Sequence, residues 1–236
     1  MAEYFSLFTL PALITAAIAY LLGSVSFSII FTKLFNNNQD IRGMGSGNAG
    51  LTNVLRSVGV KTAVFTFIFD AAKAGVAVCV GRELFRYVCV RYSLPPYLAE
   101  YGAYLAGFAC VLGHIYPLYF GFRGGKGILS TGAMLAFIDW RVFVVAISIF
   151  VVVLAITKIV SISSILGTAS IPVSNFCFVY FMEYRAGFSA HGAVSFSYVL
   201  ATTAFMLVLS AMLIWKHRAN IVRLKNGTEK KFSVKH

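Results

Sequence analysis

Long apolar stretches separated by short polar segments dominate the pattern along this chain. Residues 4–32 contain no charged side chain, and further apolar stretches occupy residues 62–80, 101–120, 142–157, 159–182 and 187–215. A helix needs about 20 mostly apolar residues, each rising about 1.5 Å, to cross a hydrocarbon core about 30 Å thick. Each stretch is therefore predicted to be a membrane-spanning helix, and the polar segment at residues 82–96 is predicted to be a connector.

The apolar stretch at residues 128–138 is shorter and is followed by Asp139 and Arg141. Eleven residues reach only about 17 Å as a helix, so this segment either re-enters the membrane or crosses with help from the local bilayer. If it crosses, 14 Lys and Arg residues fall on one side of the membrane and 5 on the other. The positive-inside rule therefore favours an all-α polytopic bundle of seven transmembrane segments, with the N-terminus outside and the C-terminus in the cytoplasm.

The composition agrees with one integral-membrane domain over residues 1–236. Hydrophobic residues make up 59% of the chain and charged residues 12%, with a mean hydropathy of +0.81. Soluble domains carry roughly a quarter charged residues, so a disordered chain, a soluble nucleic-acid-binding domain and an ordinary cytosolic enzyme are excluded. The net charge of +12 then indicates anionic lipid beside cytoplasmic loops, or an anionic substrate, and no nucleic acid.

The first of three polar clusters on the predicted cytoplasmic face is rich in glycine, with four glycines in eight residues. Glycine lets the backbone approach a ligand closely, and successive N–H groups form anion-binding nests. The candidate residues are Gly45, Ser46, Gly47, Asn48, Thr52, Asn53 and, one helical turn later, Arg56, whose guanidinium can grip a phosphate with two donors. The competing interpretation is a flexible turn between two spans. The G-x-G-x-x-G spacing is rejected as a dinucleotide fingerprint, because a membrane span precedes it instead of a strand.

The second and third clusters add basic and polar side chains on the same face. Lys126 lies among glycines at residues 124–127, where it can point at a phosphate; the alternative is a loop lysine that extends to the membrane surface. His217 and Asn220 are three residues apart and share one face of a predicted helix. The alternative for this helix is a basic segment that lies on anionic lipid.

Three further polar residues fall within the predicted spans. Asp70 and Lys73 are three residues apart, and such intramembrane pairs are functional candidates by default. The interpretation favoured here is neutralisation of one charge by the other. His114, near the end of its span, is interpreted as a structural histidine.

Taken together, the clusters resemble the bacterial acyl-phosphate:glycerol-3-phosphate acyltransferases. The resemblance runs in order through Gly23-Ser24, the GSGNxGxTN motif at residues 45–53, the GGKG at residues 124–127 and the H-R-x-N-I at residues 217–221. It implies a seven-span inner-membrane enzyme that catalyses the first step of phospholipid synthesis. Such enzymes transfer a fatty acyl group from acyl phosphate to the 1-hydroxyl of glycerol 3-phosphate, giving lysophosphatidic acid and phosphate. Leu51 departs from the family, which usually has alanine there.

The resemblance also implies roles for individual residues. Phosphate would be held by Ser46, Asn48 and Thr52, while Arg56, Lys126, His217 and Asn220 match further site positions. We expect Ser46, Arg56, Lys126 and His217 to be catalytic, and Gly45, Gly47, Asn48, Thr52, Asn53 and Asn220 to bind substrate or phosphate. No metal-ligand spacing and no Ser-His-Asp arrangement is apparent, so we expect direct transfer without metal or cofactor. Either His217 or a substrate phosphate would accept the hydroxyl proton.

The remaining alternative is a membrane transporter of phosphate or an organophosphate, which would also need a basic pocket. Transporters usually place their polar groups at the bilayer midplane, often between repeats, whereas these clusters lie at the ends of spans on one face. We therefore expect an enzyme in the bacterial cytoplasmic (inner) membrane, with its active site facing the cytoplasm. Its expected partners are acyl phosphate, glycerol 3-phosphate and membrane lipid, and we expect it to be a monomer.

Overall fold

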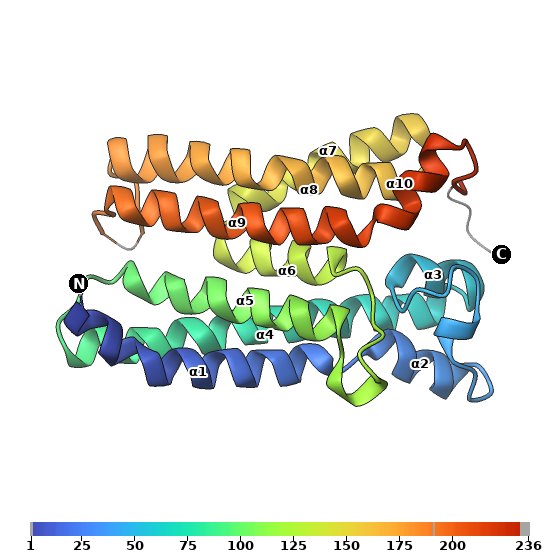
Figure 1. Cartoon of the computed structure of the whole chain (residues 1–236), viewed down its shortest axis with the longest axis horizontal. Coiled ribbons are helices and arrows are strands. Elements are labelled where there is room, and N and C mark those ends of the chain that lie inside the picture. The colour runs from blue at the N-terminus through green and yellow to red at the C-terminus, as the bar shows by residue number, and fades with distance from the viewer. Residues whose placement is uncertain (1, 191, 232–236) are drawn as a thin grey trace.

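A computed structural model describes residues 2–190 and 192–231 of the chain as a bundle of long helices (Figure 1). The long helices are α1 (Ala2–Ser24), α4 (Val60–Arg91), α5 (Leu98–Ile115), α7 (Trp140–Thr157), α8 (Val160–Cys177) and α9 (Phe196–Lys216). No strand occurs in the described part, and six of its helical segments are long and apolar enough to cross a membrane. The all-α membrane fold predicted from the sequence is confirmed.

Short elements gather at one end of the bundle, opposite the N-terminus (Figure 1). They are α2 (Phe27–Phe35), η1 (Ile41–Gly43), α3 (Leu51–Ser57) and α10 (Arg218–Lys225), and the short helix α6 (Ile128–Ile138) begins near them. The turn η2 (Leu118–Phe120) leads from α5 toward the loop that precedes α6. The three polar clusters of the sequence therefore lie at the same end of the molecule.

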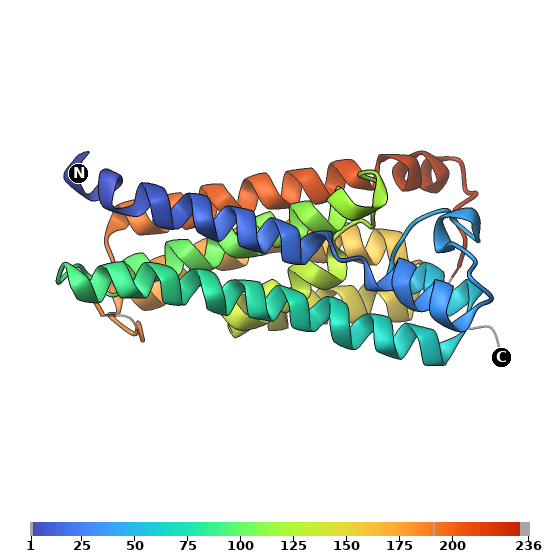
Figure 2. The same cartoon turned by 90° about the horizontal axis from the view of Figure 1, so that it is seen from below.

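Small residues allow the long helices to pack closely. A Cβ atom placed on Gly81 of α4 would lie 2.3 Å from the carbonyl oxygen of Gly102 on α5, and one on Gly23 of α1 would lie 2.1 Å from that of Cys110. In lipid there is little hydrophobic drive between helices, so close backbone approach through small residues contributes much of the packing. Figure 2 shows α4 running along the whole bundle, where it supports α1, α5 and α6.

The predicted connector at residues 82–96 is wrong for most of its length, because α4 continues to Arg91. Three of its charged residues, Arg82, Glu83 and Arg86, are paired and do not stop the helix. Arg82 donates to Glu100 of α5 over 2.7 Å, and Glu83 forms an ion pair with Arg86 one turn further on. Only residues 92–97 connect α4 to α5.

Two other predicted boundaries also change. The first apolar stretch is divided by a break between α1 and α2, where Val25 and Ser26 leave the helical conformation. The last span begins at Phe196 and not at residue 187. Gly187 and Gly192 adopt positive φ angles of 73° and 81°, and the Ser195 hydroxyl caps α9 by accepting the N–H of Tyr198.

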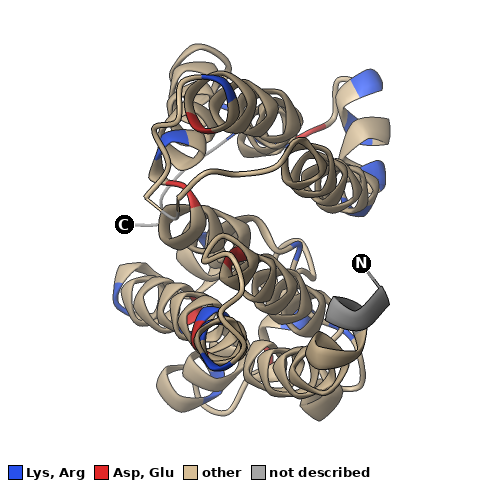
Figure 3. Ribbon diagram, turned by 90° about the vertical axis from the view of Figure 1, so that its left-hand side faces the viewer, with Lys and Arg blue, Asp and Glu red and all other residues tan. Residues whose placement is uncertain are grey.

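The short helix α6 has 11 residues and ends well before the far end of the bundle (Figure 1). Asp139 turns the chain into α7 by accepting the N–H of Arg141 over 2.9 Å. The Arg141 guanidinium also pairs with Asp139 and with Glu183, in the π-helical continuation of α8 (Phe178–Arg185). Figure 3, seen along the helix axes, shows that most of the ribbon carries no charged residue. A charge among apolar helices in a membrane is costly, and pairing with a nearby opposite charge lowers that cost.

Candidate active site

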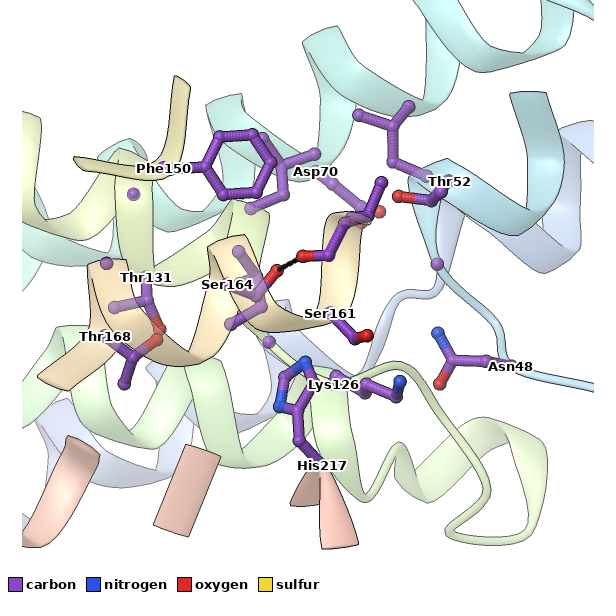
Figure 4. A pocket seen from close by; sticks show the side chains of 18 of the residues that line it. Asn48, Thr52, Asp70, Lys126, Thr131, Phe150, Ser161, Ser164, Thr168 and His217 are labelled. Atoms are coloured by element: carbon purple, nitrogen blue, oxygen red, sulfur yellow. Dashed lines mark hydrogen bonds between the residues drawn. The ribbon is translucent and has the colours of Figure 1, made fainter. Parts of the chain in front are cut away.

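A cavity of about 1120 Å³ opens at the end where the loops gather. Nine of the ten residues singled out from the sequence line it: Gly45, Ser46, Asn48, Thr52, Asn53, Arg56, Lys126, His217 and Asn220. Figure 4 shows Asn48, Lys126 and His217 around one space, although they come from three distant parts of the chain. Gly47 is not among the lining residues; it adopts a φ of 70° in the turn beside the cavity.

The glycine-rich loop is held in shape by one buried amide side chain. Asn53 is 4% exposed, and its Nδ2 donates to the carbonyl oxygens of Met44 and Asn48, both at 3.0 Å. Its Oδ1 accepts the N–H of Ser46 over 3.0 Å. Asn53 therefore serves chiefly to organise the loop, and the side chains of Asn48 and Ser46 are left for a ligand.

Helix α3 begins at Leu51, directly before Thr52. It carries Arg56 one turn later, on the wall of the cavity. Arg56 Nε is buried and has no hydrogen-bond partner in the described part of the chain. A buried donor without a partner costs about 1–3 kcal/mol, so this guanidinium is suited to receive an anion that enters the cavity.

Lys126 follows two glycines that lie directly against α5. Gly124 donates its N–H to the carbonyl of Ile115 over 3.2 Å, and Gly125 donates to that of His114 over 3.1 Å. Burial lowers the pKa of Lys126 to about 8, and its ammonium donates to Oδ1 of Asn220. The sequence clusters around Lys126 and Asn220 are therefore joined directly.

The lowered pKa of Lys126 leads to a pH dependence. The protonated amine is the form that attracts phosphate, and a phosphate monoester is already a dianion above its second pKa of about 6. We expect kcat/KM for a substrate that carries a phosphate to fall as the pH rises through about 8, well below the value of 10.5 for an ordinary lysine. In Lys126→Arg the charge persists, so the alkaline decline should move upward; a decline that stays in place would contradict this assignment.

His217 is the residue that caps the C-terminal end of α9; it is 3% exposed and lines the cavity. Its Nδ1 lies 2.8 Å from the carbonyl oxygen of Leu213, which can only accept, so Nδ1 carries the proton and Nε2 is the free acceptor. Burial lowers the pKa of His217 to about 4, so the ring is neutral at pH 7. A neutral imidazole with a free Nε2 is suited to accept a hydrogen bond from a hydroxyl group.

Glu229, an acidic residue in the otherwise basic segment at residues 216–236, was not predicted as a site residue. Its carboxylate accepts from Asn220 Nδ2 and from Arg223 Nε, each over 2.6 Å. Burial opposes ionisation of this group, but these hydrogen bonds outweigh it and lower the pKa of Glu229. Because Asn220 also accepts from Lys126, Glu229 fixes which way the Asn220 amide points. The only signal in the sequence was that Glu229 is the single acidic residue among seven Lys and Arg residues at positions 216–236.

The other missed residues extend the cavity into the bundle. Beyond the loops, hydroxyl groups from α6 and α8 and apolar side chains from α4 and α7 line the cavity together with Gly132 of α6; they include Thr131, Ser164, Thr168, Ile68, Phe143 and Phe150. Figure 4 shows Thr131 and Thr168 close together beyond Ser164. The cavity thus has a cationic end near the loops and an apolar continuation among the helices.

Comparison with known proteins agrees with this geometry. Residues 13–227 match the family model for glycerol-3-phosphate acyltransferase. Glycerol-3-phosphate acyltransferases from Clostridioides difficile (strain 630) and Thermoanaerobacter sp. (strain X514) are 39% and 36% identical to this chain. The alignments cover 94% and 95% of this chain, and 96% and 97% of those relatives.

Solved structures give the same result for the fold. The crystal structure of PlsY (YgiH), an integral membrane glycerol 3-phosphate acyltransferase, in its glycerol 3-phosphate form superposes with a TM-score of 0.71 at 30% identity, covering 94% of this chain and 96% of that one. Its lysophosphatidic acid form gives a TM-score of 0.70 at 28% identity. These matches support the acyltransferase interpretation and give no support to a transporter. The chain belongs to the glycerol-3-phosphate acyltransferase family of membrane enzymes.

Proposed function

We propose that this enzyme uses acyl phosphate as its donor and transfers the acyl group to the 1-hydroxyl of glycerol 3-phosphate. The observation that carries the proposal is the two-part cavity, whose end near the loops holds Arg56 and Lys126 and whose continuation is mostly apolar with a few hydroxyl groups. Both substrates bring a phosphate, which suits two cations with many N–H donors. A fatty chain suits the apolar part. The products are lysophosphatidic acid and inorganic phosphate.

The chemistry requires no covalent acyl-enzyme, because acyl phosphate is already activated. The glycerol oxygen attacks the acyl carbon, the bond from that carbon to the phosphate oxygen breaks, and the hydroxyl proton leaves with a phosphate or a side chain. Arg56 and Lys126 orient the phosphates and stabilise the charge on the leaving group. Ser46, Asn48 and Thr52 add donors at the glycine-rich loop, while Gly45 and Gly47 shape it.

His217 and Asn220 are assigned to the glycerol 3-phosphate side of the site. With a pKa of about 4, His217 is a weaker base at pH 7 than a phosphate whose second pKa is about 6. This difference favours His217 as the group that orients the hydroxyl through Nε2, and the substrate phosphate as the acceptor of the proton.

The apolar continuation is assigned to the acyl chain. Gly132 of α6 lines it, and a Cβ placed there would have the Phe143 ring as its nearest neighbour at 3.8 Å, which leaves room for a larger side chain. Gly132→Leu should therefore fill this space and lower kcat/KM with palmitoyl phosphate by about 10-fold or more, since even one or two misfitting methylenes cost 10–200-fold. Short donors such as butyryl phosphate serve as the control and should be little affected. Equal losses of kcat/KM for both donors would mean that the acyl chain binds elsewhere.

For the membrane, we propose seven spans that include α6, with the N-terminus outside and the active site and C-terminus in the cytoplasm of a bacterial inner-membrane protein. The charge distribution supports this arrangement. A reporter after His236 should be cytoplasmic, and one inserted within residues 93–96, the turn after α4, should be external. Two reporters on the same side would contradict the seven-span arrangement. We propose that the enzyme acts as a monomer; a single chain brings the three predicted clusters to one cavity.

The direct test uses purified protein with palmitoyl phosphate and glycerol 3-phosphate in the absence of coenzyme A. Lysophosphatidic acid and one equivalent of inorganic phosphate are the expected products. Replacing the donor with palmitoyl coenzyme A should abolish product formation. Transfer from the coenzyme A ester alone would overturn acyl phosphate as the donor while leaving the acyltransferase family assignment intact.

A further inference from the structure

Three ionisable side chains meet inside the bundle, and two of them, Asp70 and His114, line the cavity. Asp70 and Lys73 of α4 and His114 of α5 are 1%, 6% and 4% exposed. The Lys73 ammonium lies 2.7 Å from Asp70 Oδ1 and 3.3 Å from Nδ1 of His114. Separating charges from water in a membrane is costly, so groups of this kind persist where they pair closely and serve a purpose.

Lys73 also reaches the break between α1 and α2. Its ammonium donates to the carbonyl oxygen of Val25 over 2.6 Å. That carbonyl is free because the N–H of Ile29, which would bond to it in a continuous helix, bonds to Ser26 instead. One buried amine thus connects α4 to α5 and to the start of α2, the helix that leads into the glycine-rich loop.

His114 connects the cluster to the loop of Lys126. Its carbonyl oxygen accepts the N–H of Gly125 over 3.1 Å. A Cβ on Gly125 would lie 2.3 Å from His114 Nε2 and 2.6 Å from the carbonyl oxygen of Ala49, so this glycine is held between the imidazole and the glycine-rich loop. Lys126 is the next residue. The position of the imidazole therefore determines how close the two phosphate-binding loops approach.

We propose that Asp70, Lys73 and His114 form a positioning cluster that holds the Lys126 loop against the glycine-rich loop for acyl transfer. The inference rests on the proposed role of Lys126 as a phosphate ligand. Lys73 fixes the imidazole by donating to Nδ1, and Asp70 balances the charge of Lys73. The imidazole then fixes Gly125, and through it Lys126. None of the three residues is assigned a contact with the reacting atoms.

The simpler interpretation is that Asp70 and Lys73 only neutralise one another. A matched control exists in the same two helices, where Arg82 of α4 pairs with Glu100 of α5 over 2.7 Å. Neither of these two residues lines the cavity. A pair that only neutralises charge should tolerate removal of both charges, since replacing both partners avoids an unpaired buried charge.

The test compares two double variants, Asp70→Asn/Lys73→Met and Arg82→Met/Glu100→Gln. We expect both to fold, with the control close to normal in turnover and the cluster variant reduced in kcat by about 10²-fold, the loss associated with a displacement of about 1 Å. Protection against heat by inorganic phosphate, followed against pH, provides a readout independent of turnover. In the unmodified enzyme this protection should decline near pH 8. In Asp70→Asn/Lys73→Met the decline should move to higher pH, because Lys126 leaves its desolvated position while the charged groups around it, Glu229, Arg223 and Lys216, are unchanged.

A second set of variants replaces His114, in case the double variant Asp70→Asn/Lys73→Met does not fold. His114→Ala should reproduce the loss of turnover and the upward movement of the decline. His114→Asn keeps an acceptor near Nδ1 and should recover part of both. The positioning role would be overturned if either the folded double variant or His114→Ala showed full turnover and lost protection by phosphate at the same pH as the unmodified enzyme. Lys126→Ala separates the proposed role of Lys126 as a phosphate ligand from the proposed role of the positioning cluster. If this variant retains turnover and protection by phosphate, the role of Lys126 is the one that fails.

Discussion

Replacing Arg56 with lysine should lower kcat/KM for glycerol 3-phosphate by about 10²-fold or more while the bundle stays folded. Arg56 Nε is buried on the cavity wall and has no hydrogen-bond partner among the described residues, so the guanidinium is available to an anion. Lysine keeps the charge but loses the planar pair of donors, and loss of one donor to a developing anion typically costs 10²–10³-fold. Steady-state kinetics with both substrates varied, together with thermal unfolding, measure the effect.

The control for this substitution is Arg123→Lys. Arg123 belongs to the loop before Lys126, but it is exposed and does not line the cavity. Its replacement should leave kcat/KM nearly unchanged. If Arg56→Lys is as active as Arg123→Lys, then Arg56 contributes only general positive charge.

Gly45→Ala should also abolish most activity, by about 10²–10³-fold, through the shape of the loop. Gly45 has a φ of 56°, a backbone conformation that residues other than glycine rarely adopt. A Cβ there would lie 2.3 Å from Asn53 Oδ1 and 2.4 Å from the hydroxyl oxygen of Ser57. The methyl group must displace Asn53, which fixes the backbone around Ser46 and Asn48. Loss of aligned N–H donors then removes phosphate binding.

Gly43→Ala provides the comparison, because a Cβ on Gly43 would have nothing within 4 Å and its φ is not in the left-handed region. We expect normal turnover from this variant and normal protection against heat by inorganic phosphate. The Gly45→Ala protein should be protected less at every phosphate concentration, since stabilisation by a ligand follows its occupancy. Equal protection of the two variants would mean that the loop does not bind phosphate.

The individual elements show where prediction from sequence succeeded. The spans at residues 101–120, 142–157 and 159–182 correspond to helices in the structure, because an uninterrupted apolar run in lipid has few alternatives to a helix. The boundary at Arg82 was wrong because charge was taken as a sign of a connector. Glu100, which neutralises that arginine, is 18 residues away, and no local pattern announces such a pair.

The sequence by itself determined the membrane class, the helical fold and the three motifs, because apolar length and the order of glycines, cations and amides are local properties of the chain. Only the tertiary structure decided which side chains face the cavity and which support it. Asn48, Asn53 and Gly47 were all predicted to bind substrate or phosphate. In the structure, Asn53 uses its amide for hydrogen bonds within the loop and Gly47 does not line the cavity. Glu229, Asp70 and His114 acquire their places through contacts between distant segments, because burial and hydrogen-bond geometry depend on how the helices pack.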